Sequence, residues 1–173
     1  KTPGGNIDPH VCMSCQNARI ISANILQALC RLEPQHKAFF ENNYQALIRI
    51  IDKRDSTISE SFKNNPELTR KFVIYHPILT YFARDYAFEQ LAIEEEGREP
   101  SAAQIKSLIE RAKKEKIKYC LIQSEFANRN TSVFIKESHT QAMEINPLQG
   151  DWDRAMQEAA WAVQGKVPGV ANK

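Results

Sequence analysis

The hydrophobic pattern of this chain becomes strand-like at Phe72-Val73-Ile74-Tyr75-His76-Pro77. Four consecutive aromatic and β-branched residues are typical of a short strand, and the following proline marks its end. Similar runs follow at 87–93, 117–122 and 141–145. The run at 117–122 is almost entirely apolar, so we expect helices to cover both faces of the sheet there.

Helical spacing dominates the chain before and between these strand-like runs. Apolar residues recur at intervals of three, four or seven, which predicts long amphipathic helices over about 14–32 and from the break at Pro34 to about 63. A capping box at Ser101 begins a helix that continues to about 116, and weaker patterns predict helices over 128–138 and 152–163.

The order of these elements predicts the fold class. Strands that alternate with helices require crossover connections, which favour a mostly parallel sheet. We therefore predict an α/β protein in which long helices precede a four-stranded, mostly parallel sheet flanked by helices. On this prediction residues 1–63 carry an incoming loop and the long helices, residues 64–165 form the α/β lobe, and residues 166–173 are a tail.

The composition excludes several classes of protein. Of the 173 residues, 42% are hydrophobic and 25% charged, as in an ordinary globular protein. The formal net charge is only +2 and no long basic run occurs, which argues against nucleic acid as the main partner. No apolar stretch reaches the 18 or so residues that a membrane-spanning helix needs.

Candidate ligands stand where the predicted strands end. An open parallel sheet binds its ligands beyond the carboxyl ends of the strands, where His76 ends the first strand and Asn146 the fourth. Because a proline follows His76, its backbone is held extended and its ring direction is set locally, as a metal ligand requires. Taken alone, however, His76 fits a capping or core-edge histidine better, because a neutral imidazole can bond any nearby carbonyl.

Another histidine, His10, lies just before the first predicted helix. Pro9 stiffens its approach, and Asp8 could orient its imidazole. Cys12 and Cys15 follow as a C-x-x-C pair. Three interpretations stay open for this pair: a zinc half-site with His10, a redox pair with a lowered thiol pKa at a helix N-terminus, or two small buried residues.

The remaining titratable residues receive structural interpretations. We expect His36 and His139 to be solvated, Cys120 to lie in the core, and Glu94-Glu95-Glu96 to form a solvated loop. No G-x-S-x-G, P-loop, G-x-G-x-x-G or H-E-x-x-H motif occurs, so the sequence does not support an enzymatic function.

Several separated motifs, in order along the chain, resemble one family. They are Asp8-Pro9-His10-Val11 with Gln16-Asn17-Ala18, Tyr75-His76-Pro77 with the run 81–86, and the run 93–97 with Glu99-Pro100-Ser101. From about residue 5 to about residue 165 the chain resembles the zinc and manganese substrate-binding proteins of bacterial ABC transporters, the ZnuA-like or TroA-like group.

The resemblance implies a fold, a location and a function. Members of this family have two α/β lobes joined by a long rigid helix, hold a metal ion between the lobes, and deliver it to a membrane permease outside the cytoplasm. This chain is similar to the connecting helix and the second lobe only, so the missing N-terminal lobe or a second chain would complete the site. The implied transported ligand is zinc or manganese, the implied partner is an ABC transporter permease, and the implied location is periplasmic or otherwise extracytoplasmic, with a lipoprotein anchor as one form.

The resemblance also assigns ligands by motif. His10 corresponds to the ligand at the start of the connecting helix and His76 to the ligand of the second lobe. Asn146 falls where many members carry an aspartate, and this neutral oxygen donor should bind a dication more weakly. Cys12 and Cys15 stand where the family usually has Trp and Pro, and an oxidising compartment would favour a disulfide between them.

Two other functions stay open on the sequence. One is an interaction or adhesion module that derives from this family and no longer binds metal, an interpretation motivated by the missing lobe and by Asn146. The other is thiol–disulfide chemistry at Cys12 and Cys15, which predicts a thiol with a lowered pKa.

Overall fold

The computed structural model describes residues 7–94, 97–123 and 129–166, so most of the predicted tail lies outside the described residues. In chain order the elements are α1 (Cys15–Leu32), a 3-10 turn (Pro34–His36), α2 (Lys37–Lys63), β1 (Lys71–Ile74), α3 (Thr80–Asp85), β2 (Glu89–Ala92), α4 (Ala102–Lys114), β3 (Tyr119–Gln123), α5 (Arg129–Ser138), β4 (Gln141–Ile145) and α6 (Trp152–Ala162). This order confirms the predicted α/β class with two long helices ahead of the sheet. Of these helices, none is both long and apolar enough to cross a bilayer.

The four strands form one sheet in the order β2-β1-β3-β4, and every strand pair is parallel. The carboxyl ends of all four strands therefore lie along one edge. The segments that follow the strands are brought together there, although they are far apart in the sequence.

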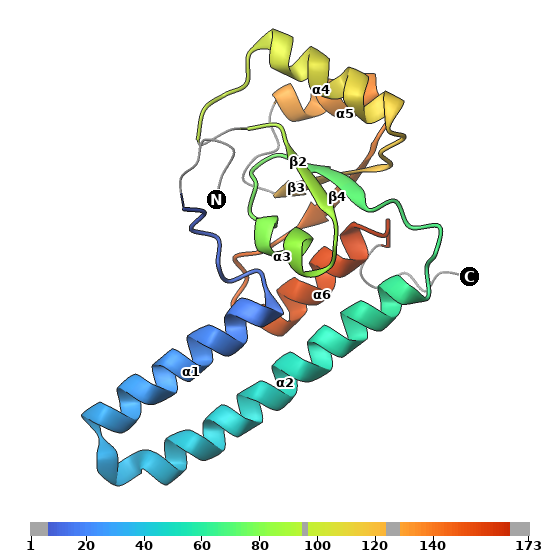
Figure 1. Ribbon diagram of the computed structural model, residues 1–173. Helices are drawn as coiled ribbons and strands as arrows, with labels where there is room; N and C mark the ends of the chain where they lie inside the picture. Colours follow the sequence, from blue (N-terminus) through green and yellow to red (C-terminus); the bar gives the residue numbers. More distant parts are fainter. Residues whose placement is uncertain (1–6, 95–96, 124–128, 167–173) are drawn as a thin grey trace.

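Helices cover both faces of the sheet, as the apolar run of β3 predicts. Ile74 and Leu121 enter a core shared with α2, α3 and α6, whereas Val73 and Cys120 pack with α4 and α5 on the other face. Figure 1 shows α4 and α5 on one side of the sheet and α3 and α6 on the other. The alternation of β1 and β3 residues between two cores is the expected result of the two-residue repeat of a strand.

The two long helices form an antiparallel hairpin whose tip projects away from the sheet (Figure 1). Ser14 caps α1 by accepting a hydrogen bond from the Asn17 N–H. Arg19 of α1 donates to Asp52 and Asp55 of α2, each at 2.8 Å. The base of the hairpin belongs to the core of the sheet, because buried residues of both helices pack there.

Candidate metal site

The backbone of β1 carries His76 to the carboxyl edge of the sheet. Pairing continues one residue past the strand, because the Tyr75 N–H donates to the Leu121 carbonyl and the Tyr75 carbonyl accepts from the Glu94 N–H. A tight turn follows, in which the Ile78 N–H donates to the His76 carbonyl at 2.7 Å. His76 thus stands at the edge that the sequence predicts for it.

The loop that carries His10 is held in place on both sides of the histidine. The Tyr81 hydroxyl of α3 donates to the Asp8 carbonyl at 2.9 Å, and the Trp152 indole of α6 donates to the Cys12 carbonyl at 2.8 Å. Two donors from different helices therefore fix the backbone around His10.

The two imidazoles meet at one point. His10 Nε2 lies 3.0 Å from His76 Nε2, although 66 positions separate the residues in the chain. The ring centroids are 4.8 Å apart and the ring planes are nearly perpendicular, at 86°. The two side chains are 22% and 25% exposed, so both imidazoles are partly accessible to solvent.

A carboxylate holds the far nitrogen of each ring. Asp8 Oδ1 lies 2.8 Å from His10 Nδ1, and Glu94 Oε1 lies 3.2 Å from His76 Nδ1. A carboxylate accepts hydrogen bonds, which favours the tautomer with the proton on Nδ1 of each ring. The 3.0 Å approach of the two Nε2 atoms fits a hydrogen bond between the rings when one Nε2 carries a proton, and it fits two ligands of one cation when neither does.

Asp8 is built to stay ionised. It is only 2% exposed, and burial by itself would raise its pKa. Hydrogen bonds from the His10 N–H, from Thr80 and from the His10 ring outweigh burial, so the pKa of Asp8 is lowered. The negative charge therefore persists beside His10 at neutral pH.

Glu94 corrects an expectation drawn from the sequence. The run 94–96 was expected to form a solvated loop, but Glu94 is only 7% exposed and contacts the His76 ring. Glu95 and Glu96 lie outside the described residues. Glu94 follows a predicted strand directly, as His76 does, and this position could have identified it. The two neighbouring glutamates made the run resemble a solvated loop instead.

Gln123 is a second residue that the sequence analysis missed. It is the last residue of β3 and is buried, and its Nε2 donates to the His76 carbonyl at 3.0 Å. The same strand-end rule would have found it, but a lone glutamine has no strong chemical signature.

Asn146 lies at the same edge but apart from the two histidines. It follows β4, which β3 separates from β1, so two strand spacings of about 4.8 Å lie between their ends. Its side chain is exposed and its carbonyl accepts from the Gln149 N–H. Its role as a ligand stays a prediction. Within the described part of the chain, no group of three or more His, Cys, Asp or Glu side chains is arranged to hold a metal ion.

The C-x-x-C pair differs from a redox site. Cys12 is exposed, Cys15 is buried, and both are free thiols. Burial raises the pKa of the Cys15 thiol to about 11, so the lowered pKa expected for a redox pair is wrong for this residue. The reason is that Cys15 faces the core beside the Tyr86 hydroxyl, 3.3 Å away, rather than solvent.

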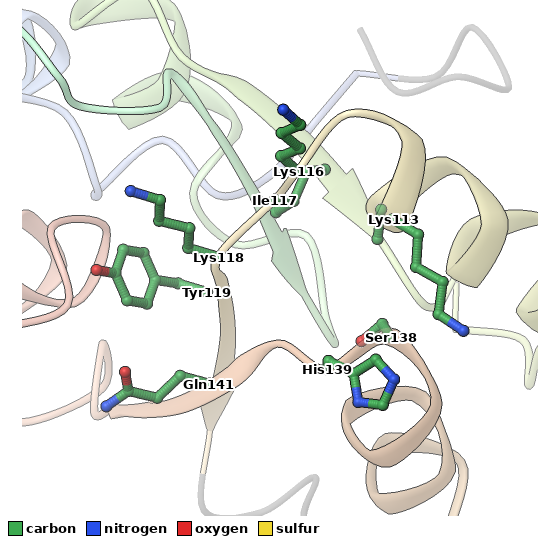
Figure 2. Close-up of a pocket in the computed structure, with 9 residues that line it drawn as sticks. Lys113, Lys116, Ile117, Lys118, Tyr119, Ser138, His139 and Gln141 are labelled. Atoms are coloured by element: carbon green, nitrogen blue, oxygen red, sulfur yellow. The ribbon is translucent and has the colours of Figure 1, made fainter.

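Cys120 and the other two histidines behave as expected. Cys120 is fully buried, which raises its pKa to about 12, and His36 and His139 are exposed. His139 lines a shallow hollow of about 500 Å³ beside the amino ends of β3 and β4, opposite the histidine pair. The lysines around this hollow diverge from one another in Figure 2, so they do not form a cradle for an anion.

An open parallel α/β lobe binds ligands beyond the carboxyl ends of its strands, and this lobe brings two carboxylate-paired imidazoles to that edge. Residues 2–160 match the model of the family described as "ZnuA: Zinc-uptake complex component A periplasmic". The chain belongs to this family.

Individual relatives are similar over most of the chain. It is 30% identical to the manganese ABC transporter substrate-binding lipoprotein scaA of Streptococcus gordonii over 140 residues, which are 78% of this chain and 44% of that protein. It is 31% identical to the zinc-binding lipoprotein AdcA of Streptococcus pneumoniae over 144 residues, 82% of this chain and 28% of that protein. The chain thus spans less than half the length of these curated relatives.

A solved structure supports the fold. A crystal structure of ZnuA superposes with a TM-score of 0.85 and 28% identity, over 92% of this chain and 62% of that chain. The arrangement of helices and strands described above is therefore that of the corresponding part of ZnuA.

Proposed function

We propose that this chain is the metal-binding lobe of an extracytoplasmic substrate-binding protein that delivers zinc, or manganese, to an ABC transporter permease. The observation that carries the proposal is the 3.0 Å approach of two Nε2 atoms whose rings are oriented by carboxylates. Membership of the zinc-uptake family supports it, as do the functions for which the relatives scaA and AdcA are named. Their description as lipoproteins supports a membrane-anchored location.

The separation of the two nitrogens suits a single ion. With zinc–nitrogen bonds of about 2.0–2.1 Å, two ligands at the tetrahedral angle lie about 3.3 Å apart, and two at a right angle lie about 2.9 Å apart. The observed 3.0 Å falls within this interval. The carboxylates of Asp8 and Glu94 supply two negative charges behind the rings, which balance the charge of a dication.

His10 and His76 are the proposed protein ligands, with Asn146 as a weaker oxygen ligand from the same edge of the sheet. Two imidazoles and an amide leave a position for water or for a ligand from elsewhere. We propose that the N-terminal lobe of a longer protein, or a second chain, supplies the missing ligand. Affinity of the chain alone should therefore be modest, and its action is binding and release rather than catalysis.

Zinc titration followed by calorimetry tests the proposal on the chain and on His10→Ala and His76→Ala. We expect one zinc ion per chain, and its loss in either variant. His139→Ala is the matched control, since this exposed histidine lies at the opposite edge of the sheet, and it should bind zinc like the parent chain. Equal binding by all four proteins would exclude the assignment.

A further inference from the structure

The amide oxygen of Gln123 is buried without a hydrogen-bond partner among the described residues. The residue is only 2% exposed, and its Oε1 atom shares this situation with just one other described side-chain atom, Oε1 of Gln164. Because Nε2 donates to the His76 carbonyl, the orientation of the amide is settled: the reverse orientation would place two oxygens in contact.

Gln123 lies beside His76 on the neighbouring strand. Ile74 pairs with Leu121, and the same register two residues on places Gln123 next to His76. Alternation along the strands puts both residues on the face of Ile74 and Leu121, which is the face that the loop of His10 approaches. Gln123 therefore lies beside the backbone of His76, at the edge of the sheet where the histidine pair stands.

The amide has one structural contact, the hydrogen bond from its Nε2 to the His76 carbonyl, which also accepts from the Ile78 N–H. That contact leaves the amide oxygen without a donor among the described residues. A buried acceptor without a donor is unfavourable, and leucine or methionine would fill the same space without that penalty. A donor from a bound molecule would remove this penalty.

We propose that Gln123 Oε1 accepts a hydrogen bond from a water molecule that completes the coordination of the ion held by His10 and His76. This inference rests on the proposed function and adds a positioning residue to it. A metal ion makes its bound water a stronger hydrogen-bond donor, and an amide oxygen can only accept. The site thereby holds an ion together with part of its hydration shell.

The variant Gln123→Leu distinguishes a role in metal binding from a role in stability, because we expect it to weaken zinc binding without lowering the melting temperature. Without metal, its melting temperature should equal or exceed that of the parent chain, because a buried unpaired oxygen is gone. Its zinc affinity should fall by about tenfold, the lower range for loss of a group that supports metal ligands. The matched control is Gln164→Leu, which removes the other unpaired amide oxygen at the end of α6 and should leave zinc affinity unchanged.

A second variant, Gln123→Met, keeps nearly the same length and removes the amide acceptor without adding a charge. We expect its zinc affinity to fall by about tenfold, as in Gln123→Leu. The visible absorption of bound Co²⁺ should also change, which a purely structural residue would not cause. If the parent chain binds zinc and the Gln123 variants show the same zinc affinity and the same Co²⁺ spectrum, the inference is overturned. If the parent chain itself does not bind zinc, the proposed function is overturned instead.

Discussion

At the scale of single residues, Asp8 orients His10 through two hydrogen bonds, one to the backbone N–H and one to the ring. The variant Asp8→Asn keeps the shape but removes the charge that holds the Nδ1 proton. We expect zinc affinity, measured by calorimetry, to fall by about 10- to 100-fold, the range typical of such partners. Asp52→Asn, an exposed carboxylate on α2, is the control and should have no effect. Full affinity in Asp8→Asn would show that His10 does not depend on this carboxylate.

The two thiols near His10 should differ in reactivity. Cys12 is exposed, whereas Cys15 is buried with its pKa raised to about 11. In the folded chain at pH 7.5, iodoacetamide should modify Cys12 within minutes and leave Cys15 largely intact, as peptide mass spectrometry would measure. Denaturant should remove the difference. Rapid modification of Cys15 in the folded chain would revive a thiol-based function.

Residue identity in the site could be predicted only in part. The position of His76 at a strand end before proline is a weak signal taken alone, and the resemblance to the family assigns His10 and His76 as ligands. Their convergence depends on how the loop before α1 folds over the sheet, and Tyr81 and Trp152 control that through contacts distant in sequence. The burial of Glu94 could not be predicted from the run of three glutamates, because burial depends on how the chain folds around it.

At the scale of secondary-structure elements, strong periodicity predicted the long helices and all four strands to within a few residues. The structure adds α3, six residues that make fewer than two turns and therefore show no helical period. This short helix is not incidental, because Thr80 and Tyr81 from its first turn hold the Asp8 segment.

The helical hairpin is joined to the lobe by an ion pair between α2 and α6. Arg54 donates to both carboxylate oxygens of Asp153, at 2.7 and 2.5 Å, and its side chain is only 17% exposed. A half-buried, two-pronged pair contributes more than an exposed one, so Arg54→Ala should lower the free energy of unfolding by about 1–3 kcal/mol in urea titrations. Lys37→Ala removes an exposed pair with Glu41 and should change it by less than about 0.5 kcal/mol. Equal effects would mean that Arg54 does not anchor the hairpin.

At the scale of the whole molecule, stability should fall in acid. Hydrogen bonds from Arg111 and Lys71 lower the pKa of Glu115 from an ordinary 4.5 to about 2, and the pKa values of Glu89 and Asp153 are also lowered. A carboxyl group whose pKa is lower in the folded chain stabilises that state above its unfolded pKa, and this contribution disappears as the pH falls through the folded value.

The melting temperature should therefore be nearly constant from pH 7 to about 5 and decrease steadily between about pH 4.5 and 2. In the variant Glu115→Gln this decrease should be smaller, because one of the titrating groups is absent. A Glu115→Gln profile with the full decrease would show that this carboxylate is not linked to stability.

The hairpin also presents an apolar surface. Ile21, Ile25 and Leu32 on one face of α1 are 37%, 53% and 75% exposed, and Phe39 of α2 is 62% exposed. Exposed apolar patches of this kind usually bind another surface, since covering them removes apolar area from water. We therefore expect the chain to associate with copies of itself as its concentration rises, with light scattering giving a mass above the 19.8 kDa of one chain.

The double variant Ile25→Lys with Leu32→Lys should remain monomeric at the same concentrations, because two charges interrupt the apolar surface of α1. Val133→Lys with Leu148→Lys is the matched control: these side chains are 40% and 74% exposed but lie on the lobe, so the control should associate like the parent chain. A mass of one chain at every concentration for all three proteins would show that the hairpin surface does not drive self-association. If zinc raises the mass of the parent chain but not that of its His76→Ala variant, the second copy also contributes to the site, because the ion then links the two chains.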